Sequence, residues 1–389
     1  MSCYISSNNE RVYVALESSY GTVPAITAAN RIPLVKLGAR QVAEQTGRRD
    51  KTGSRTFPGL PNHLRKKTNF EIDTLMTEWT NQPSAPPQGP LFQAAMGGSP
   101  ILFSGGTVAS SSGTQVTFTA PHGLSAGQGV TFSGEMRFVA AIQDSTTVFL
   151  NAPFSTPPGA GSTFGTTMTY SLAESLGSAS LFDYWDPSTA VQRIVDGAAM
   201  DRMTIKVNGD YQEFQFAGPA RDVIDSASFE SGDDGLSSYP AEPTVGGFDY
   251  TIVPGHLGEA WLGATETQFS TITAAELRLE NNIELRAREF GSDFARCIAA
   301  STRKITLNFE LFELDDAQTK GLYQAARSRS PIGVMLQLGE QTNQLFGAYM
   351  PAMVPEVPEY DDSETRLQWK FSNSRAQGTS GDELYVAFG

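Results

Sequence analysis

The feature that most constrains this chain is a stretch from Thr302 to Ala326 whose hydrophobic period changes partway along. In its first half apolar and polar residues alternate, which is the pattern of a strand with one buried face, the apolar set being Ile305, Leu307, Phe309 and Leu311. In its second half the spacing is helical: Asp315 or Asp316 can cap the helix, and Ser330-Pro331 ends it. The stretch therefore predicts a long strand followed by a short helix.

A looser second copy of this unit begins at Arg65, with the sequence RKKTNFEIDTLMTEW. Phe70 and Ile72 alternate there with Glu71 and Asp73, and a short PLFQAAMGG segment follows. A chain that repeats a strand-plus-helix unit is expected to contain two copies of one module.

Length and composition set the outer limits. A chain of 389 residues with 40% apolar residues can bury more than one core, and two or three domains are expected. No run of about 18 apolar residues is present and the N-terminus lacks a signal-peptide layout, so we expect a soluble cytoplasmic product without membrane insertion or secretion. Cys3 and Cys297 lie far apart, which argues against a disulfide framework and for ordinary packing.

The composition changes abruptly at Gly105. Residues 105–166 are rich in Gly, Ser and Thr, carry only three charged residues, and contain the short β-prone runs QVTFT, GVTFS, RFVAAI and TVFLN. This pattern is typical of a small all-β sandwich or barrel. We expect an autonomous inserted domain that faces outward and can be replaced by a linker without loss of assembly.

Other segments complete the organisation. RVYVALE reads as a strand, residues 41–64 as a long exposed loop, and Asn208-Gly209 marks a hairpin between two alternating runs. Alternation through Leu277, Leu279, Ile283 and Leu285 predicts one further strand. The expected fold class is mainly β, with a discontinuous first module (1–104 and 167–232), the inserted domain (105–166), a linker (233–270) and a second module (271–389), each module having a short α-helix.

No catalytic, cofactor or metal constellation is present in the sequence. The three histidines, His63, His122 and His256, lie in separate turn-rich regions without ligand spacing. The acidic pairs Asp315-Asp316 and Asp361-Asp362 fit a helix cap and a solvated turn better than glycosidase carboxylates. We therefore expect a protein that is not an enzyme and has no cofactor.

Three stretches, taken in order, carry a family resemblance: ALESSYGTVP, RKITLNFELFELDDAQTKGLYQAA and GAYMPAMVPEVPEYDDSETRLQWKF. Over residues 11–100 and 170–389 the chain resembles the major tail tube proteins of long-tailed, siphovirus-type bacteriophages, particularly those with two tandem tube modules. The resemblance implies β-sandwich modules with one flanking helix, whose inner strands join between subunits into a barrel around a lumen that conducts phage DNA.

The same resemblance implies partners and a location. Rings of the protein would stack with themselves and meet a tape measure protein, a tail terminator and a distal tail protein. The protein would be assembled in the host cytoplasm and reside in the virion. Because both modules carry the repeated unit, we expect a homotrimer that forms a pseudo-hexameric ring, with a homohexamer as the alternative.

Charge suggests which residues face the lumen and the next ring. The acidic residues that alternate with core residues on predicted strands would face the lumen together, or alternatively outer solvent: Glu71, Asp73, Glu280, Glu284 and Glu310. Residues 1–104 carry 11 Lys and Arg against 7 Asp and Glu, whereas residues 169–270 carry 4 against 16. Such runs are either solvated faces or complementary docking patches. In the second case the basic residues of the long loop, Arg48, Arg49, Lys51 and Arg55, would reach an acidic surface of the adjacent ring.

A function of a different class is compatible with the same residues. A capsid-decorating or adhesive β-protein would use residues 105–166 to bind a host carbohydrate or receptor. Self-assembly separates the two hypotheses, because only the tube subunit should polymerise into long tubes with an axial hole.

Overall fold

The computed structural model describes residues 4–44, 50–60, 64–248, 251–262, 268, 271–363 and 365–389. Strands dominate, as expected, and the described part of the chain contains two α-helices, α1 (Gly89–Met96) and α2 (Ala317–Ser328). Three short 3-10 helices are also present, at Ser7–Asn9, Ala28–Asn30 and Asp233–Gly235. The protein is therefore mainly β.

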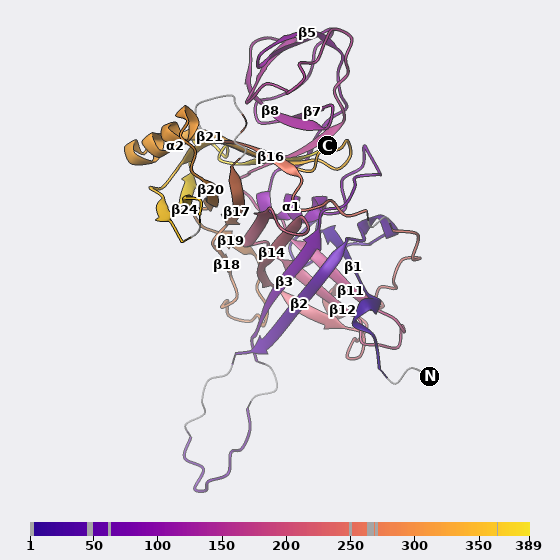
Figure 1. Cartoon of the computed structure of the whole chain (residues 1–389). Helices are drawn as coiled ribbons and strands as arrows, with labels where there is room; N and C mark the ends of the chain where they lie inside the picture. Colours follow the sequence, from indigo (N-terminus) through magenta and orange to yellow (C-terminus); the bar gives the residue numbers. More distant parts are fainter. Residues whose placement is uncertain are drawn as a thin grey trace.

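The largest sheet runs through most of the chain (Figure 1). Its path is β2 (Leu34–Ala43), β3 (Lys66–Leu75), β14 (Glu213–Ala220), β13 (Arg202–Val207), β17 (Ile272–Glu280), β20 (Lys304–Phe312), β24 (Gln368–Ala376), β22 (Phe346–Val354), β25 (Tyr385–Phe388), β10 (Thr167–Ser171) and β4 (Ile101–Phe103). Off this path, β21 (Ile332–Leu338) joins β22 to β16 (Gly258–Leu262), and β23 (Glu359–Asp361) pairs with β24.

Three smaller sheets accompany it. The first has the order β1 (Glu10–Leu16), β11 (Ala179–Trp185), β12 (Arg193–Ala198) and β15 (Asp222–Asp225). The second is the pair β18 (Ile283–Leu285) and β19 (Ile298–Ala300). The third has the order β5 (Val108–Ser112), β6 (Gln115–Phe118), β9 (Thr147–Leu150), β8 (Glu135–Ile142) and β7 (Gly129–Phe132), so the four β-prone runs of residues 105–166 are confirmed as strands.

The strand and helix predicted in the organising stretch are confirmed as β20 and α2. The side chain of Asp316 accepts a hydrogen bond from the Thr319 backbone N at 2.7 Å, so Asp316 is the N-cap. Arg329 adopts φ 54° at the C-terminal end and stops the helix before Pro331. Helix α1 has a proline in its first turn and ends at Gly97, whose φ is 84°.

One hydrophobic core joins both halves of the sequence. It extends from Val12 and Val14 to Val386 and Phe388, and Phe92 of α1 lies at its centre without solvent exposure. The Phe92 ring contacts aromatic rings from several strands, with centroid distances of 5.1–6.2 Å, namely Tyr170, Phe214, Phe216, Phe346 and Phe388. The parts of the chain expected as two modules are therefore packed on each other through α1.

The pairing of β10 and β4 departs from the boundaries drawn from the sequence. Met168 lies opposite Phe388 in the β10–β25 register, and β4 pairs with β10. The strands that flank the five-stranded sheet therefore belong to the sheet that contains β22 and β25, and not to the sheet beside β1. The change of composition at Gly105 indicates where a new segment begins. Composition does not indicate which distant strands pair with each other.

The five-stranded sheet encloses a core of its own and also packs on the large sheet. One of its faces encloses its own core, which includes Phe118, Phe154 and Phe164. Met136 and Phe138 on its other side share a second cluster with Leu345, which precedes β22, and with residues of β16, β21, β22 and β25, namely Trp261, Met335, Tyr349, Tyr385 and Ala387. At this contact a Cβ added to Gly347 would lie 2.4 Å from Met136 Sδ, so the two sheets are closely packed.

Hydrogen bonds and ion pairs also stabilise the contact between the five-stranded sheet and the large sheet. Gln337 Oε1 accepts from the Met136 backbone N at 2.7 Å, and Gln337 Nε2 donates to Gly134 O at 3.2 Å. The fully buried Arg137 guanidinium lies 4.0 Å from the Trp261 ring centroid and pairs with Glu135 and Glu259. The few charges of residues 105–166 therefore accompany a packed interface with the large sheet, which argues against replacing these residues by a linker without loss of stability.

The hairpin at Asn208-Gly209 is confirmed, but its turn is longer than two residues. Ile205 lies opposite Phe214, and residues 208–212 form the connection. Asn208 has φ 66° and its side-chain amide donates to Thr273 O. Contacts with the neighbouring segment therefore override the local preference for a tight turn.

Candidate assembly surface

A polar face extends across eight neighbouring strands of the large sheet, β2-β3-β14-β13-β17-β20-β24-β23, which we call the long sheet. On β3, Phe70, Ile72 and Thr74 are buried in the core whereas Glu71 and Asp73 point the other way. Residues directly opposite in antiparallel strands share a face. The register therefore carries this outward face from β2 to β23.

The charges on this polar face are mixed. Its basic residues are Lys36, Arg40, Lys67, Arg202, Lys206, Arg278, Lys304, Lys370 and Arg375. Its acidic residues are Glu71, Asp73, Glu213, Glu276, Glu280, Glu310, Glu359 and Asp361. The two signs nearly cancel over the face.

Four of the five acidic residues predicted to face a lumen lie on this polar face: Glu71, Asp73, Glu280 and Glu310. Glu284 does not, because the chain leaves β17 after Glu280 and Glu284 lies exposed on β18. Buried Asn281 donates to Ala95 O at 2.8 Å and to Met200 O at 2.9 Å, and Asn282 has φ 52°. The prediction of one strand continuing through Ile283 and Leu285 is therefore wrong.

Most of these acids have basic or amide partners on the face. Lys36 Nζ lies 3.2 Å from Glu71 Oε2, and Arg278 lies 3.7 Å from Glu280. Glu310 Oε2 accepts from Gln368 Nε2 at 2.9 Å. The acidic surface expected from the alternation alone is therefore a charge-compensated surface, because basic residues occupy the same face of the same strands.

Asp73 is the exception. Its Oδ1 is buried and has no hydrogen-bond partner among the described residues. Burial, followed by the negative charge of Glu71, raises the pKa of the Asp73 carboxyl. Protonation of Asp73 is therefore more favourable than that of an ordinary exposed aspartate.

The long sheet is joined in the middle by β13 and β17, which belong to distant parts of the sequence. Arg202 lies opposite Glu280, and Lys206 lies opposite Glu276. Opposite charges directly across an antiparallel pair stabilise the pairing, by roughly 0.2–1 kcal/mol each. This joint therefore combines backbone pairing with charge matching.

The two ends of the long sheet are unpaired strand edges among the described strands. β2 has β3 as its single strand partner, and β23 has β24. Apolar side chains are exposed at both ends, with Val35 on β2 51% exposed and Tyr360 on β23 56% exposed. Open edges with exposed apolar residues are templates for pairing with another chain.

Residues 50–60 lie beyond the ends of β2 and β3 and extend away from the sheets (Figure 1). Lys51 and Arg55 are fully solvent-facing there, as predicted for an exposed loop, and so is Phe57, 63% exposed. Arg48 and Arg49 lie outside the described residues. We call residues 50–60 the arm.

Several acids of residues 169–270 form ion pairs inside the chain. Asp183 pairs with Arg193 and Asp196 with Arg221, both at 2.5 Å, and Glu242 pairs with Arg11. Among the described residues of this range, the acids that stay exposed are Glu174, Asp186, Asp210, Glu230 and Asp233, with Glu213 partly exposed. These residues are available to a docking surface for a basic segment.

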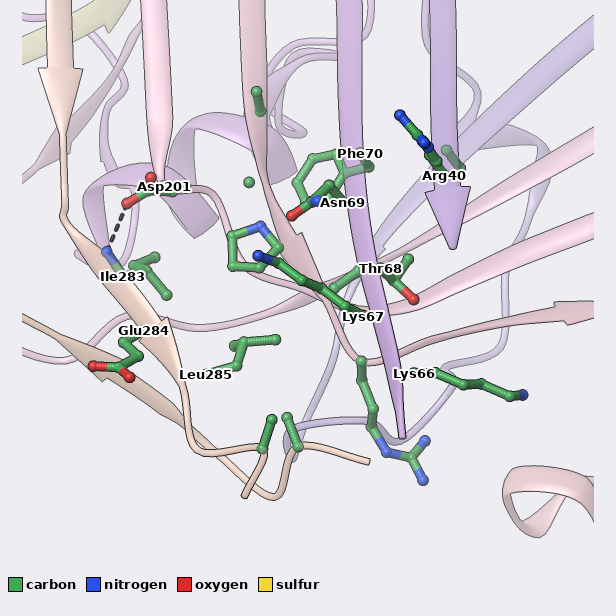
Figure 2. A pocket seen from close by; sticks show the side chains of 18 of the residues that line it. Arg40, Lys66, Lys67, Thr68, Asn69, Phe70, Asp201, Ile283, Glu284 and Leu285 are labelled. Carbon is green, nitrogen blue, oxygen red and sulfur yellow. Dashed lines mark hydrogen bonds between the residues drawn. The ribbon is translucent and has the colours of Figure 1, made fainter. Parts of the chain in front are cut away.

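A groove of about 1100 Å³ opens where β2 ends and β3 begins. Figure 2 shows Lys67 and Asn69 of the polar face on one side and Ile283, Glu284 and Leu285 of β18 on the other. Asp201 accepts a hydrogen bond from the Ile283 backbone N at 2.6 Å and ties β18 to the sheet. Arginine, lysine, aspartate and glutamate all line the groove, so it lacks the uniform positive charge that a phosphate site needs.

The histidine, cysteine and acidic residues of the described ranges do not gather into a metal site. No group of three or more His, Cys, Asp or Glu residues is placed to hold a metal ion there. Of the histidines, His122 accepts from the Leu124 backbone N at 2.8 Å and is held in a turn, and His63 lies outside the described residues. Neither α1 nor α2, the two helices of those ranges, is long and apolar enough to cross a membrane.

A pair of buried carboxyl groups lies away from the polar face. Glu10 Oε1 and Asp183 Oδ1 are both buried without a hydrogen-bond partner, while Asp183 Oδ2 accepts from Arg193. Burial, and then the charge of Asp183, raises the pKa of Glu10 to about 7. A protonated Glu10 can donate to Asp183 and satisfy both atoms.

This pair predicts a pH dependence of stability. Between the ordinary Glu pKa of 4.5 and about 7 the unfolded chain releases the Glu10 proton while the folded chain keeps it, so stability falls as pH rises through that window. In Glu10→Gln, the decrease in thermal stability from pH 5 to pH 8 should be smaller by on the order of 1–2 kcal/mol, since one pKa unit is about 1.4 kcal/mol. Glu174→Gln, at a side chain 92% exposed, is the control. Parallel melting curves for Glu10→Gln and the unmodified protein would contradict the assignment.

No protein-family model matches the chain, and no curated protein matches it. The assignment of a function therefore rests on the surface described above.

Proposed function

We infer that the protein is a structural subunit of the tail tube of a long-tailed bacteriophage, which assembles in the host cytoplasm into stacked rings and becomes part of the virion. The observation that carries this proposal is the long sheet, with a core face, a polar face and an open edge at each end. Copies joined edge to edge would close into a barrel whose polar face lines a lumen.

A repeat within the long sheet supports two tandem tube modules. The order β2-β3-β14 on one side of the β13–β17 joint corresponds to β17-β20-β24 on the other. The middle strands carry the same tripeptide, Asn69-Phe70-Glu71 on β3 and Asn308-Phe309-Glu310 on β20, and each is followed by a helix. In this proposal each module contributes one set of strands, and the five-stranded sheet of residues 108–150 lies on the outside.

The polar face suits passage of DNA better than binding of DNA. Clustered Lys and Arg hold the phosphate backbone by releasing counterions, and affinity grows with the number of phosphates neutralised. Here acidic residues alternate with the basic ones, as in Glu276, Arg278 and Glu280 along β17. Such a surface offers no continuous basic track, and the same face would contact a tape measure protein before DNA enters.

Electron microscopy of the purified protein tests the proposal. We expect stacked rings with an axial hole and three chains per ring, because each chain carries both sets of strands. Six chains per ring would mean that each chain fills only one position of a six-fold ring. That result would contradict the pseudo-hexameric arrangement. A closed oligomer without tubes that binds a carbohydrate would favour the decorating or adhesive function.

The arm is expected to serve ring stacking, where a tail terminator or distal tail protein would replace the next ring at the tube ends. Reversing both charges in Lys51→Glu/Arg55→Glu should leave single rings intact and shorten or abolish tubes, because exposed acids such as Glu230 and Asp233 would then repel the arm. Tube length measured by microscopy checks this, and Lys51→Gln/Arg55→Gln, which removes charge without reversing it, should give an intermediate length. Tubes of normal length from the reversed variant would remove the arm from the stacking contact.

A further inference from the structure

The free edges of the long sheet carry opposite charges. β2 presents Lys36 and Arg40 on the polar face, and β23 presents Glu359 and Asp361 on the same face. The strand joint inside the chain has the reverse arrangement, with basic Arg202 on β13 and acidic Glu280 on β17. In the repeat, β2 of the first strand set corresponds to β17 of the second strand set. Likewise β23, which pairs with β24, corresponds to β13, which pairs with β14.

We propose that β2 of one copy pairs antiparallel with β23 of a second copy of this chain, with the basic edge against the acidic edge. The inference rests on the proposed function and names the strands and charges that close the ring. The pairing repeats the β13–β17 joint between chains, but with the signs exchanged. It would also cover Val35 and Tyr360, which are exposed in the single chain.

The charges also exclude the wrong pairings. If the β2 strands of two copies paired, Lys36 and Arg40 of one copy would face Lys36 and Arg40 of the other. If two β23 strands paired, acidic residues would face acidic residues. Like charges directly opposite each other are destabilising. Symmetric edge-to-edge dimers are therefore disfavoured. The remaining arrangement is head to tail, the kind of contact that builds a ring when the rotation between neighbouring copies closes.

The sequence around β23 limits where a partner strand can pair. Pro355 and Pro358 precede it, and a proline has no N–H to donate to a neighbouring strand. Pairing therefore begins at Glu359, and Glu359 and Asp361 are the acidic residues in reach of β2. Both acids lie opposite β24 residues, and Asp361 pairs with Lys370 at 2.6 Å, which holds the edge in an extended conformation.

Charge reversal on one edge at a time tests the proposal. We expect Lys36→Glu/Arg40→Glu and Glu359→Lys/Asp361→Lys each to remain monomeric at concentrations at which the unmodified protein is fully assembled, as measured by light scattering and microscopy. The chain with all four changes should assemble with itself again, and a labelled form should be excluded from rings of the unmodified protein. Lys51→Glu/Arg55→Glu, an equal charge change away from the edges, should still form rings.

A second measurement uses the unmodified protein, so its result does not depend on whether the variants fold correctly. Amide hydrogen exchange in β2 should slow by at least tenfold when the unmodified protein assembles, while exchange in the buried strand β20 stays unchanged. Single-edge reversals that still form rings, or β2 amides that stay unprotected in rings, would overturn this inference and leave the tube function standing. An unmodified protein that stays monomeric would overturn both.

Discussion

Replacing residues 107–164 with a short Gly/Ser linker is expected to yield a protein that unfolds or aggregates. The deletion would uncover Trp261, Met335 and Tyr349, which are 6%, 1% and 7% exposed in the intact chain. Burying a large apolar side chain contributes about 1.5–3 kcal/mol, so the loss is roughly 5 kcal/mol or more, against a total stability of about 5–15 kcal/mol. Differential scanning calorimetry and the soluble fraction on expression measure the effect.

The control for this deletion is a change on the outward side of the same sheet. Phe149 on β9 is 36% exposed and lies outside the cluster around Trp261, so Phe149→Ala should destabilise the protein much less than the deletion does. A deletion variant that melts like the intact protein would mean that the cluster around Trp261 contributes little. It would also restore the sequence-based expectation that residues 105–166 are dispensable.

Phe92→Ala is expected to destabilise the protein by about 3–5 kcal/mol, the range for truncating a fully buried phenylalanine. The ring contacts Phe214 from one part of the chain and Phe346 and Phe388 from another, so its removal opens a cavity that neither half can fill alone. The midpoint of unfolding by urea should fall while the transition stays single.

The matched control is Phe57→Ala on the arm, where the side chain is 63% exposed and no buried contact is lost. Its unfolding midpoint should match that of the unmodified chain. Two separate unfolding transitions in Phe92→Ala would show that the halves are independent units joined only by the β13–β17 pairing.

The sequence predicted individual strands well and their partners poorly. Alternation located β3 and β20, and the acid at Asp316 located the start of α2, because these signals are local. No local signal showed that β10 would pair with β25, or that Met136 would pack near Trp261. Those contacts depend on residues more than a hundred positions apart.

The polar face could be predicted only in part. Parity places Glu71, Asp73, Glu280 and Glu310 on one face, but the register puts the basic residues Lys36 and Arg278 on that face too, so the acidic residues alone do not define its charge. Glu284 was misplaced because the pattern resumes after two asparagines, and only the buried hydrogen bonds of Asn281 reveal that the chain turns there.

The pairing of β10 with β25 also has a kinetic consequence. Met168 and Phe388 lie opposite each other across the strands, yet about 200 residues are synthesised between them. During that interval β10 must keep the apolar side chains of Met168 and Tyr170 away from other nascent chains. Folding should therefore be slow compared with synthesis, and a lower expression temperature should increase the soluble yield more than it does for proteins whose strands pair with sequence neighbours.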